Sequence, residues 1–290
     1  MAIFRSYTKP GKGISKEDVE KTGISLYFDI LFRRFGKLVS VNLMYLLFSI
    51  PAIIISFFIA TYLMNAVISF EGIEKTMDLY AVMTVLSVPF TALIFQATGS
   101  GPATIAMNTI TGKYVRDTNA WIWSDFIDSF KHNFKQGIAM YLINTLVFFA
   151  CAFAFLFYSY VMGGAMASVL RTFIIVIAMV FFVMQFYTYR IAAEFELKTK
   201  HVYRNALLLT FAGLKWNIFA AIVVITMMCL TYTLIAEIFA AGIAILLTIY
   251  FVLLTFTQSF ITNNIVKKYL LEPSLKMQEE AEKKDTEDDE

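Results

Sequence analysis

The sequence predicts an all-α, polytopic membrane protein with six transmembrane helices, and its composition and charge distribution support this fold class. Hydrophobic residues make up 59% of the 290 residues and charged residues only 16%, whereas a soluble domain carries about a quarter charged residues. The charges are also clustered, which leaves uncharged runs long enough for a helix of roughly 20 residues to cross a bilayer. These runs are residues 38–70, 79–112, 136–170, 172–189, 216–236 and 238–266.

The first two predicted spans each contain a proline. The first span covers residues 38–65 and includes Pro51, and the second covers residues 79–98 and includes Pro89. Proline lacks the backbone N–H and its ring clashes with the preceding helical turn. Both prolines are therefore candidate hinge residues at which a helix bends.

The third and fourth spans form a predicted pair, at residues 137–161 and 170–190. Two adjacent glycines, Gly163 and Gly164, lie between them and favour a tight turn. Arg171 and Arg190 lie at the ends of the fourth span, and their long side chains are expected to reach the lipid headgroups by snorkelling.

The fifth and sixth spans are predicted from the length of the last apolar stretch. Residues 216–266 contain a single charged residue, Glu237, and one helix of that length would far exceed a hydrocarbon core about 30 Å thick. The chain is therefore expected to turn near Glu237, so that the fifth and sixth spans lie on either side of it.

Three further segments have the pattern of interfacial amphipathic helices, at about residues 24–36, 119–135 and 199–213. In the first two, apolar residues recur at steps of three and four, which gives one helical stripe. The third begins at a plausible N-cap, Thr199, and ends near Gly213. Amphipathic helices joined to membrane spans lie at the membrane surface or dock a partner.

A Gly99-Ser100-Gly101-Pro102 break follows the second span. Gly99, Gly101 and Pro102 are candidate hinge residues, and Pro102 suits the first turn of a new helix. The break has no phosphate-binding lysine and follows no strand, so a nucleotide-binding loop is excluded.

The two ends of the chain differ from its centre. Residues 1–23 are polar and basic and read as a flexible leader, without the apolar core of a signal peptide. Residues 24–270 are expected to form a single transmembrane helical domain. Residues 271–290 are acidic and nearly free of large apolar side chains, which predicts a disordered tail.

Lysine and arginine predict the orientation. With six spans, 22 of the 24 Lys and Arg residues fall on the side that holds both termini, and only Lys75 and Arg171 fall on the other. Cytoplasmic segments carry the excess of positive residues. The sequence therefore predicts a multi-pass membrane protein with its N-terminus and C-terminus in the cytoplasm.

The two halves share a weak sequence similarity. Residues 134–138 read FKQGI and residues 214–218 read LKWNI, and each stretch follows an amphipathic segment and enters a span. Internal repeats are common in transporters, although two matches of five residues also arise by chance.

Three segments resemble the YesL-like family of bacterial integral membrane proteins. They are FGKLVSVNLMYLLFSIP at 35–51, GPATIAMNTITGKYVRDTNAWIWSDFIDSFKHNFKQ at 101–136 and FELKTKHVYRNALL at 195–208. In shorter family members the first segment leads almost directly to the second. Here residues 52–98 intervene, as an extra hairpin.

The resemblance implies a location in the plasma membrane of a bacterium and a role in sugar uptake. The family has no established activity, but its members tend to be encoded beside carbohydrate ABC importers. The expected function is thus an accessory protein of carbohydrate ABC import, with the importer's permease or ATPase subunits as partners. A self-contained small-solute transporter or channel and a membrane sensor or scaffold are the alternatives.

An aromatic stripe is the candidate docking surface for such a partner. It consists of Trp121, Trp123, Phe126, Phe130 and Phe134. The alternative is that these residues pack beneath the chain's own helices or anchor in the headgroup layer, where tryptophan is enriched.

The remaining polar residues suggest no catalytic chemistry. His132 and His201 have no carboxylate or cysteine at ligand spacing, so neither an enzyme, nor a metal or cofactor site, nor nucleic-acid binding is expected. Amide side chains within the spans could line a polar path or form hydrogen bonds between helices. These are Asn42, Asn65, Gln96, Asn108, Asn144, Gln185 and Gln258.

Overall fold

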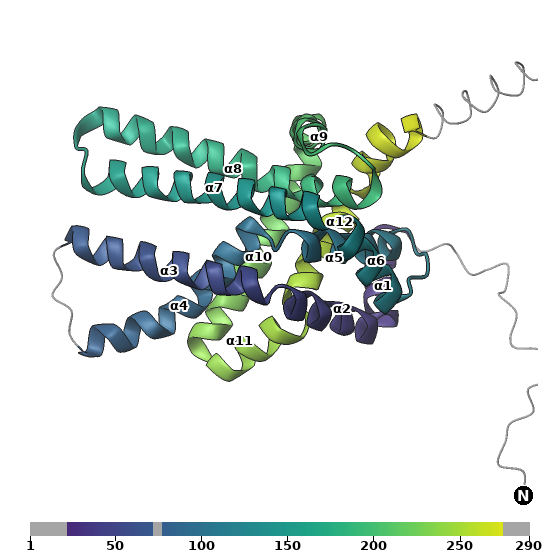
Figure 1. Ribbon diagram of the computed structural model, residues 1–290, viewed down its shortest axis with the longest axis horizontal. Helices are drawn as coiled ribbons and strands as arrows, with labels where there is room; N and C mark the ends of the chain where they lie inside the picture. The colour runs from purple at the N-terminus through teal and green to yellow at the C-terminus, as the bar shows by residue number, and fades with distance from the viewer. Residues whose placement is uncertain (1–21, 72–76, 275–290) are drawn as a thin grey trace, which may run out of the picture. The chain divides into compact units, whose positions relative to one another are not determined.

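The computed structural model describes residues 22–71 and 77–274, and every regular element within these residues is helical (Figure 1). The predicted all-α fold is confirmed. In this part of the chain, five helical stretches are long and apolar enough to cross a membrane. They are α3 (Ile50–Glu71), α7 (Phe134–Tyr160), α8 (Gly164–Glu194), α10 (Leu214–Glu237) and the continuous stretch from α11 (Phe239–Ile245) through α12 (Phe251–Val266) to Ser274.

The predicted second span is α4 (Met77–Thr98), whose 22 residues correspond to about 33 Å at 1.5 Å per residue. Its length suits a membrane crossing, and a count of six spans stays a prediction. Pro89 lies within this helix. α4 packs along α3 and also contacts α7.

The described residues form two compact units, one ending at Phe35 and one beginning at Gly36. The first contains α1 (Gly23–Arg33), which confirms the amphipathic helix predicted at 24–36. Within it the rings of Phe28 and Phe32 stack at 6.0 Å, and Arg33 pairs with Asp29 at 3.4 Å. The predicted leader, apart from its last two residues, lies outside the described residues.

The predicted span at 38–65 is interrupted by one residue, Ser49, two residues before the candidate hinge Pro51. Two helices occupy this stretch, α2 (Phe35–Phe48) and α3, with Ser49 between them. Pro51 cannot donate a backbone hydrogen bond, and the regular helix is interrupted where the proline bend was expected: the N–H of Ser49 bonds to the Leu46 carbonyl, three residues back, at 3.1 Å. The Ser49 side chain then bonds to Ser100 at 2.7 Å, which fixes the break against the α4–α5 junction.

A sharp elbow of one residue recurs between an interfacial helix and the helix that follows it. Asn133 separates α6 (Ile122–His132) from α7 with φ −95° and ψ 14°, and Gly213 separates α9 (Thr199–Ala212) from α10 with φ −104° and ψ 24°. Arg34, after α1, has φ −110° and ψ 12°. The α6–α7 and α9–α10 elbows have similar backbone angles, and they lie at the two stretches that share a weak sequence similarity.

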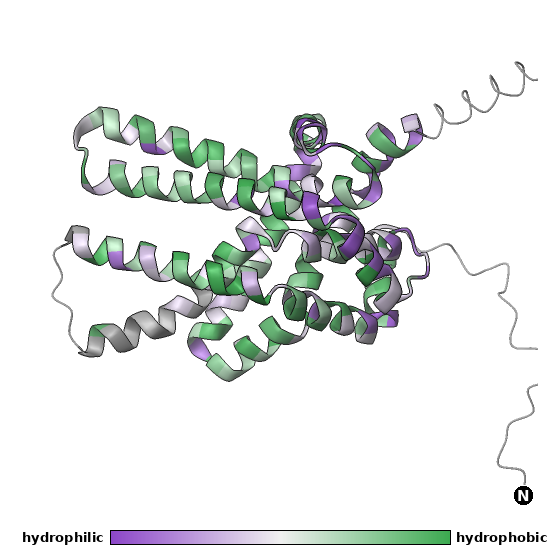
Figure 2. Cartoon of the chain, in the orientation of Figure 1, coloured by the Kyte–Doolittle hydropathy of each residue, from purple (hydrophilic) through white to green (hydrophobic). Residues whose placement is uncertain are grey.

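α5 (Pro102–Val115) is the central helix of the second unit. Twelve of its fourteen residues are buried, and it packs against α6, α7, α8 and α12. Figure 2 shows that α7 and α8 are mostly hydrophobic along their length, while hydrophilic residues gather around α5, α6 and α9. The sequence predicted no more for this segment than a helix that begins at Pro102, and the structure surrounds that helix with α6, α7, α8 and α12.

Several predicted boundaries are confirmed and two are corrected. The turn at Gly163-Gly164 and the break after Glu237 are present. The fourth span is longer than 170–190, since α8 runs to Glu194. The tail predicted from residue 271 is helical as far as Ser274, because a π-helical turn, η2 (Lys267–Leu271), continues α12.

Candidate functional site

The junction between α4 and α5 holds three of the predicted hinge residues. Gly99 and Gly101 have φ of +70° and +66°, a region that favours glycine, and Pro102 begins α5 as expected. A Cβ on Gly101 would lie 2.6 Å from the carbonyl oxygen of Gly137 at the start of α7. The junction is thus buried and closely packed against α7.

A hydrogen-bond network centred on Asn144 joins four helices next to this junction. The Asn144 amide of α7 donates to the hydroxyl of Tyr189 on α8 at 2.8 Å, and Tyr189 donates to the Thr98 carbonyl that ends α4 at 2.8 Å. Asn144 and Gln185 exchange hydrogen bonds of 3.1 and 3.2 Å. Tyr203 of α9 donates to Asn144 at 2.7 Å, and burial raises the pKa of Tyr203 above its ordinary value.

A small polar cavity of about 30 Å³ lies beside this network. Four of the seven amide residues singled out in the sequence line it, namely Gln96, Asn108, Gln185 and Gln258. Asn108 is 2% exposed; its amide nitrogen donates to the Thr104 carbonyl at 2.8 Å, whereas its side-chain oxygen has no hydrogen-bond partner. Because a cavity of this size holds about one water-sized group, it is a candidate binding site.

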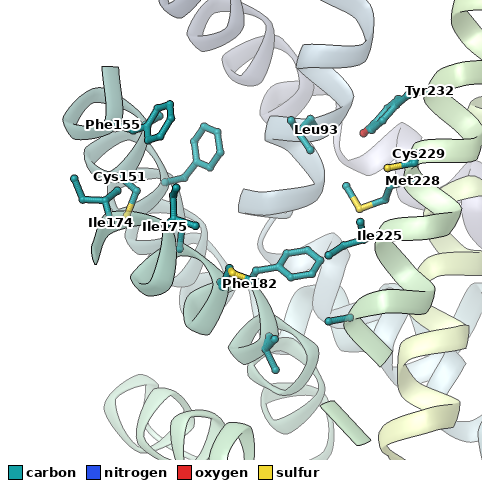
Figure 3. A pocket seen from close by; sticks show the side chains of 16 residues that line it. Leu93, Cys151, Phe155, Ile174, Ile175, Phe182, Ile225, Met228, Cys229 and Tyr232 are labelled. Carbon is teal, nitrogen blue, oxygen red and sulfur yellow. The ribbon is translucent and has the colours of Figure 1, made fainter. Parts of the chain in front are cut away.

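A larger apolar crevice of about 590 Å³ lies between α7 and α8 on one side and α10 on the other. Figure 3 shows Cys151 and Phe155 facing Met228 and Tyr232 across it, with Leu93 of α4 nearby. All these residues belong to helices suited to the membrane or to the predicted second span. The crevice is therefore lined by helices whose length and composition suit a membrane.

Arg190 is buried, which corrects the expectation that it reaches the headgroups. Its side chain is 0% exposed, and its guanidinium donates to the Ser259 carbonyl at 2.8 Å and to the Asn263 side chain at 2.6 Å, both on α12. It also contacts Glu194 at 3.3 Å, and Glu194 accepts a 2.6 Å bond from Arg116 of α5. Because the protein itself satisfies this charge, Arg190 has no need to reach water.

Asn42 connects α2 to an irregular turn that precedes α12. In this π-helical turn, η1 (Leu246–Tyr250), the regular backbone bonding of an α-helix is interrupted. Asn42 donates to the Leu247 carbonyl at 2.8 Å and accepts from the Val252 N–H at 3.1 Å. Its side chain is therefore a structural link between helices.

The aromatic stripe is divided between two environments. Phe126 is 0% exposed and Phe130 is half-buried, and both rings lie against Phe48 of α2 at 5.5 and 4.9 Å. These two residues pack within the chain, which removes Phe126 from the expected docking surface. Trp121 and Trp123 are 82% and 66% exposed, and Phe134 is also exposed.

The two histidines and Glu237 do not line the polar cavity. His132 is exposed and lies 3.7 Å from Glu196, which is also exposed. His201 is exposed on α9, and Glu237 is exposed at the end of α10. Among the described residues, no group of three or more His, Cys, Asp or Glu side chains is placed to hold a metal ion.

Comparison with known proteins supports a family resemblance over the central part of the chain. A family model described as "Protein of unknown function, DUF624" matches residues 80–155, and the YesL-like proteins belong to this group. No curated protein and no solved structure matches the chain. The matched residues run from α4 into α7, so they include the α4–α5 junction, Asn108 and Asn144.

Proposed function

We propose that this chain is an accessory membrane protein of carbohydrate ABC import that binds its partners through α6. The main support for this proposal is the exposure of the Trp121 and Trp123 side chains, at 82% and 66%. Exposed tryptophans on a rigid element are the residues most enriched in the energetic centres of protein interfaces. Outside the membrane, a soluble surface rarely leaves two neighbouring tryptophans uncovered.

The start of α6 is held rigidly, which suits a docking surface. Asp125 accepts a bond from Lys113 of α5 at 2.7 Å and from the backbone N–H of Trp121 at 2.9 Å. Thr109 of α5 and Ser129 of α6 add a further bond of 2.8 Å. Because α6 is fixed to the buried α5, its exposed face would bind a partner at little cost in ordering.

The choice of partner rests on charge and on the family resemblance. The segment that bears the tryptophans lies on the side rich in Lys and Arg, which the positive-inside rule assigns to the cytoplasm. The ATPase subunits of an ABC importer and the cytoplasmic loops of its permeases are available there. The tendency of YesL-like proteins to be encoded beside carbohydrate importers supports these partners.

Co-purification with the importer tests this function. The double variant Trp121→Asp/Trp123→Asp is expected to lose the permease and ATPase subunits that accompany the tagged wild-type protein, while still inserting into the membrane. Trp216→Asp is the matched control, since Trp216 is 53% exposed at the start of α10. Retention of the subunits by the double variant would contradict docking through α6, as would wild-type protein that purifies without them.

A self-contained transporter of small solutes is the second candidate, and the polar cavity favours it. The cavity is lined from α2, α4, α5, α8 and α12, so helix movements of the kind that transporters make would enlarge it. Purified protein in proteoliposomes would then take up radiolabelled mono- or disaccharides, and Asn108→Leu would abolish uptake. Uptake no greater than that of empty liposomes would dismiss this candidate.

A further inference from the structure

The apolar crevice and the polar cavity are adjacent, and Phe182 of α8 lines both. In Figure 3 its ring extends from α8 across the crevice toward Ile225 of α10. Phe182 also packs edge-on against Phe186, with ring centroids 5.3 Å apart, and Phe186 lines the cavity. One aromatic side chain therefore separates a hydrophobic space from a hydrophilic one.

The change from apolar to polar occurs in the same direction on two helices. On α8 the lining passes from Phe182 in the crevice to Gln185 in the cavity, and on α4 it passes from Leu93 to Gln96. Three helical residues advance about 4.5 Å. The bond between Tyr189 and the Thr98 carbonyl sets the two helices side by side in this register.

This polarity matches that of a lipid in the inner leaflet. The ends of α4 and α8 toward which the lining becomes polar belong to the side rich in Lys and Arg, predicted to be cytoplasmic. A lipid of that leaflet has its polar end on the same side and its chain pointing to the bilayer centre. The crevice is reached from outside the bundle, since Met179 and Ile225 on its walls are 59% and 43% exposed.

The cavity defines the polar end of the ligand. No Asp, Glu, Lys or Arg lines it, so a charged group there would have no partner of opposite charge. Its volume of about 30 Å³ admits one group of the size of a water molecule. The unpartnered side-chain oxygen of Asn108 is an acceptor, which a hydroxyl would satisfy as donor.

We propose that the crevice and the cavity together bind one neutral, single-chain lipid. Its hydrocarbon chain lies between α8 and α10, and its hydroxyl-sized end passes Phe182 and donates a hydrogen bond to Asn108. This site is independent of docking through α6.

Photo-crosslinking of the full-length protein in proteoliposomes tests the proposal. Three probes carry a diazirine at the same carbon of a sixteen-carbon chain: a primary alcohol, the corresponding alkane and the corresponding fatty acid. The alcohol is expected to label peptides of α8 and α10 that line the crevice, and to do so more strongly than either other probe. Excess unlabelled hexadecanol should remove this labelling.

Variants separate the two halves of the site. Ala178→Phe places a ring in the crevice, so labelling by the alcohol should fall to background. Asn108→Leu should remove the preference for the alcohol over the alkane; Thr255→Val, a near-isosteric change in the cavity wall, is the milder alternative if the first variant does not fold. Asn65→Leu on α3 is the control and should label as the wild type does.

Two results would overturn the proposal, and both come from the wild-type protein. Equal labelling by alkane and alcohol would mean that the crevice takes bulk lipid without help from the cavity. Stronger labelling by the fatty acid would show that the polar end is charged.

Discussion

The hydroxyl of Tyr189 donates a 2.8 Å hydrogen bond to the main-chain oxygen of Thr98, and this contact fastens the last residue of α4 to α8. The same hydroxyl accepts a bond from Asn144 of α7. One side chain therefore joins three helices where the chain enters the α4–α5 junction. Gly99 lies so close that a Cβ there would be 2.7 Å from the Tyr189 oxygen.

Tyr189→Phe should destabilise the protein. The change leaves a buried carbonyl and a buried amide with fewer partners, which costs about 1–3 kcal/mol. Thermal unfolding in detergent should show a lower Tm, by about 2–4 °C for each kcal/mol. Tyr62→Phe is the control, since Tyr62 is 57% exposed on α3; equal Tm values for the two variants would contradict a role of the Tyr189 hydroxyl.

Gly101→Ala should prevent assembly of the α4–α5 junction. The φ of +66° strains any other residue, and the added Cβ would meet the Gly137 backbone at 2.6 Å. The yield of monodisperse protein in size-exclusion chromatography should drop sharply. Gly36→Ala makes the same chemical change within α2, where a Cβ meets nothing within 4 Å, and it should be tolerated; normal yield for Gly101→Ala would refute the close packing.

Asn42→Ala should destabilise the bundle by removing the side chain that bonds to Leu247 in the π-helical turn and to Val252 in α12. The buried Val252 N–H would lose its acceptor, at about 1–3 kcal/mol, and the part-buried Leu247 carbonyl would lose a donor. Asn65→Ala provides the comparison, since Asn65 bonds to the Thr61 carbonyl of its own helix. The prediction fails if the two variants unfold at the same temperature.

Arg190→Met should cost about 3–5 kcal/mol, the range for breaking a buried ion pair by removing one partner. Ser259 and Asn263 on α12 lose their donors, and Glu194 keeps only Arg116 as a cation. Changing Glu194 to Leu as well should recover part of the stability, because the remaining buried charge is removed. Arg171→Met, at a partly exposed position, should have little effect; a similar Tm for both single variants would show that Arg190 is solvated.

The sequence signals that succeeded are local ones. The amphipathic stripe predicted α6, the glycines at 163–164 predicted the turn before α8, and the isolated charge of Glu237 predicted the end of α10. Hydrophobic periodicity and charge spacing can be read from neighbouring residues, without knowing which distant segments pack together. The three interfacial helices and the turns were therefore found near their observed positions.

Features that depend on a distant partner were missed. Arg190 ends an apolar run, and the sequence looks the same whether its guanidinium reaches headgroups or Asn263, seventy-three residues further on. α5 has the modest hydrophobicity of a surface segment, yet it is buried because four other helices surround it. The grouping of Gln96, Asn108, Gln185 and Gln258 at one cavity likewise required the fold, although each residue had been singled out.

Placement in the membrane, with the Lys- and Arg-rich side in the cytoplasm, underlies both proposals. Cysteine accessibility tests it most directly, in a background where Cys151 and Cys229 are alanine. Asn119→Cys lies in the segment before α6 and Gly163→Cys in the turn between α7 and α8; neither position is buried. A membrane-impermeant maleimide applied to intact cells should label Gly163→Cys alone, and Asn119→Cys should react only once the membrane is opened. Labelling of Asn119→Cys in intact cells, or of neither position until lysis, would contradict the account.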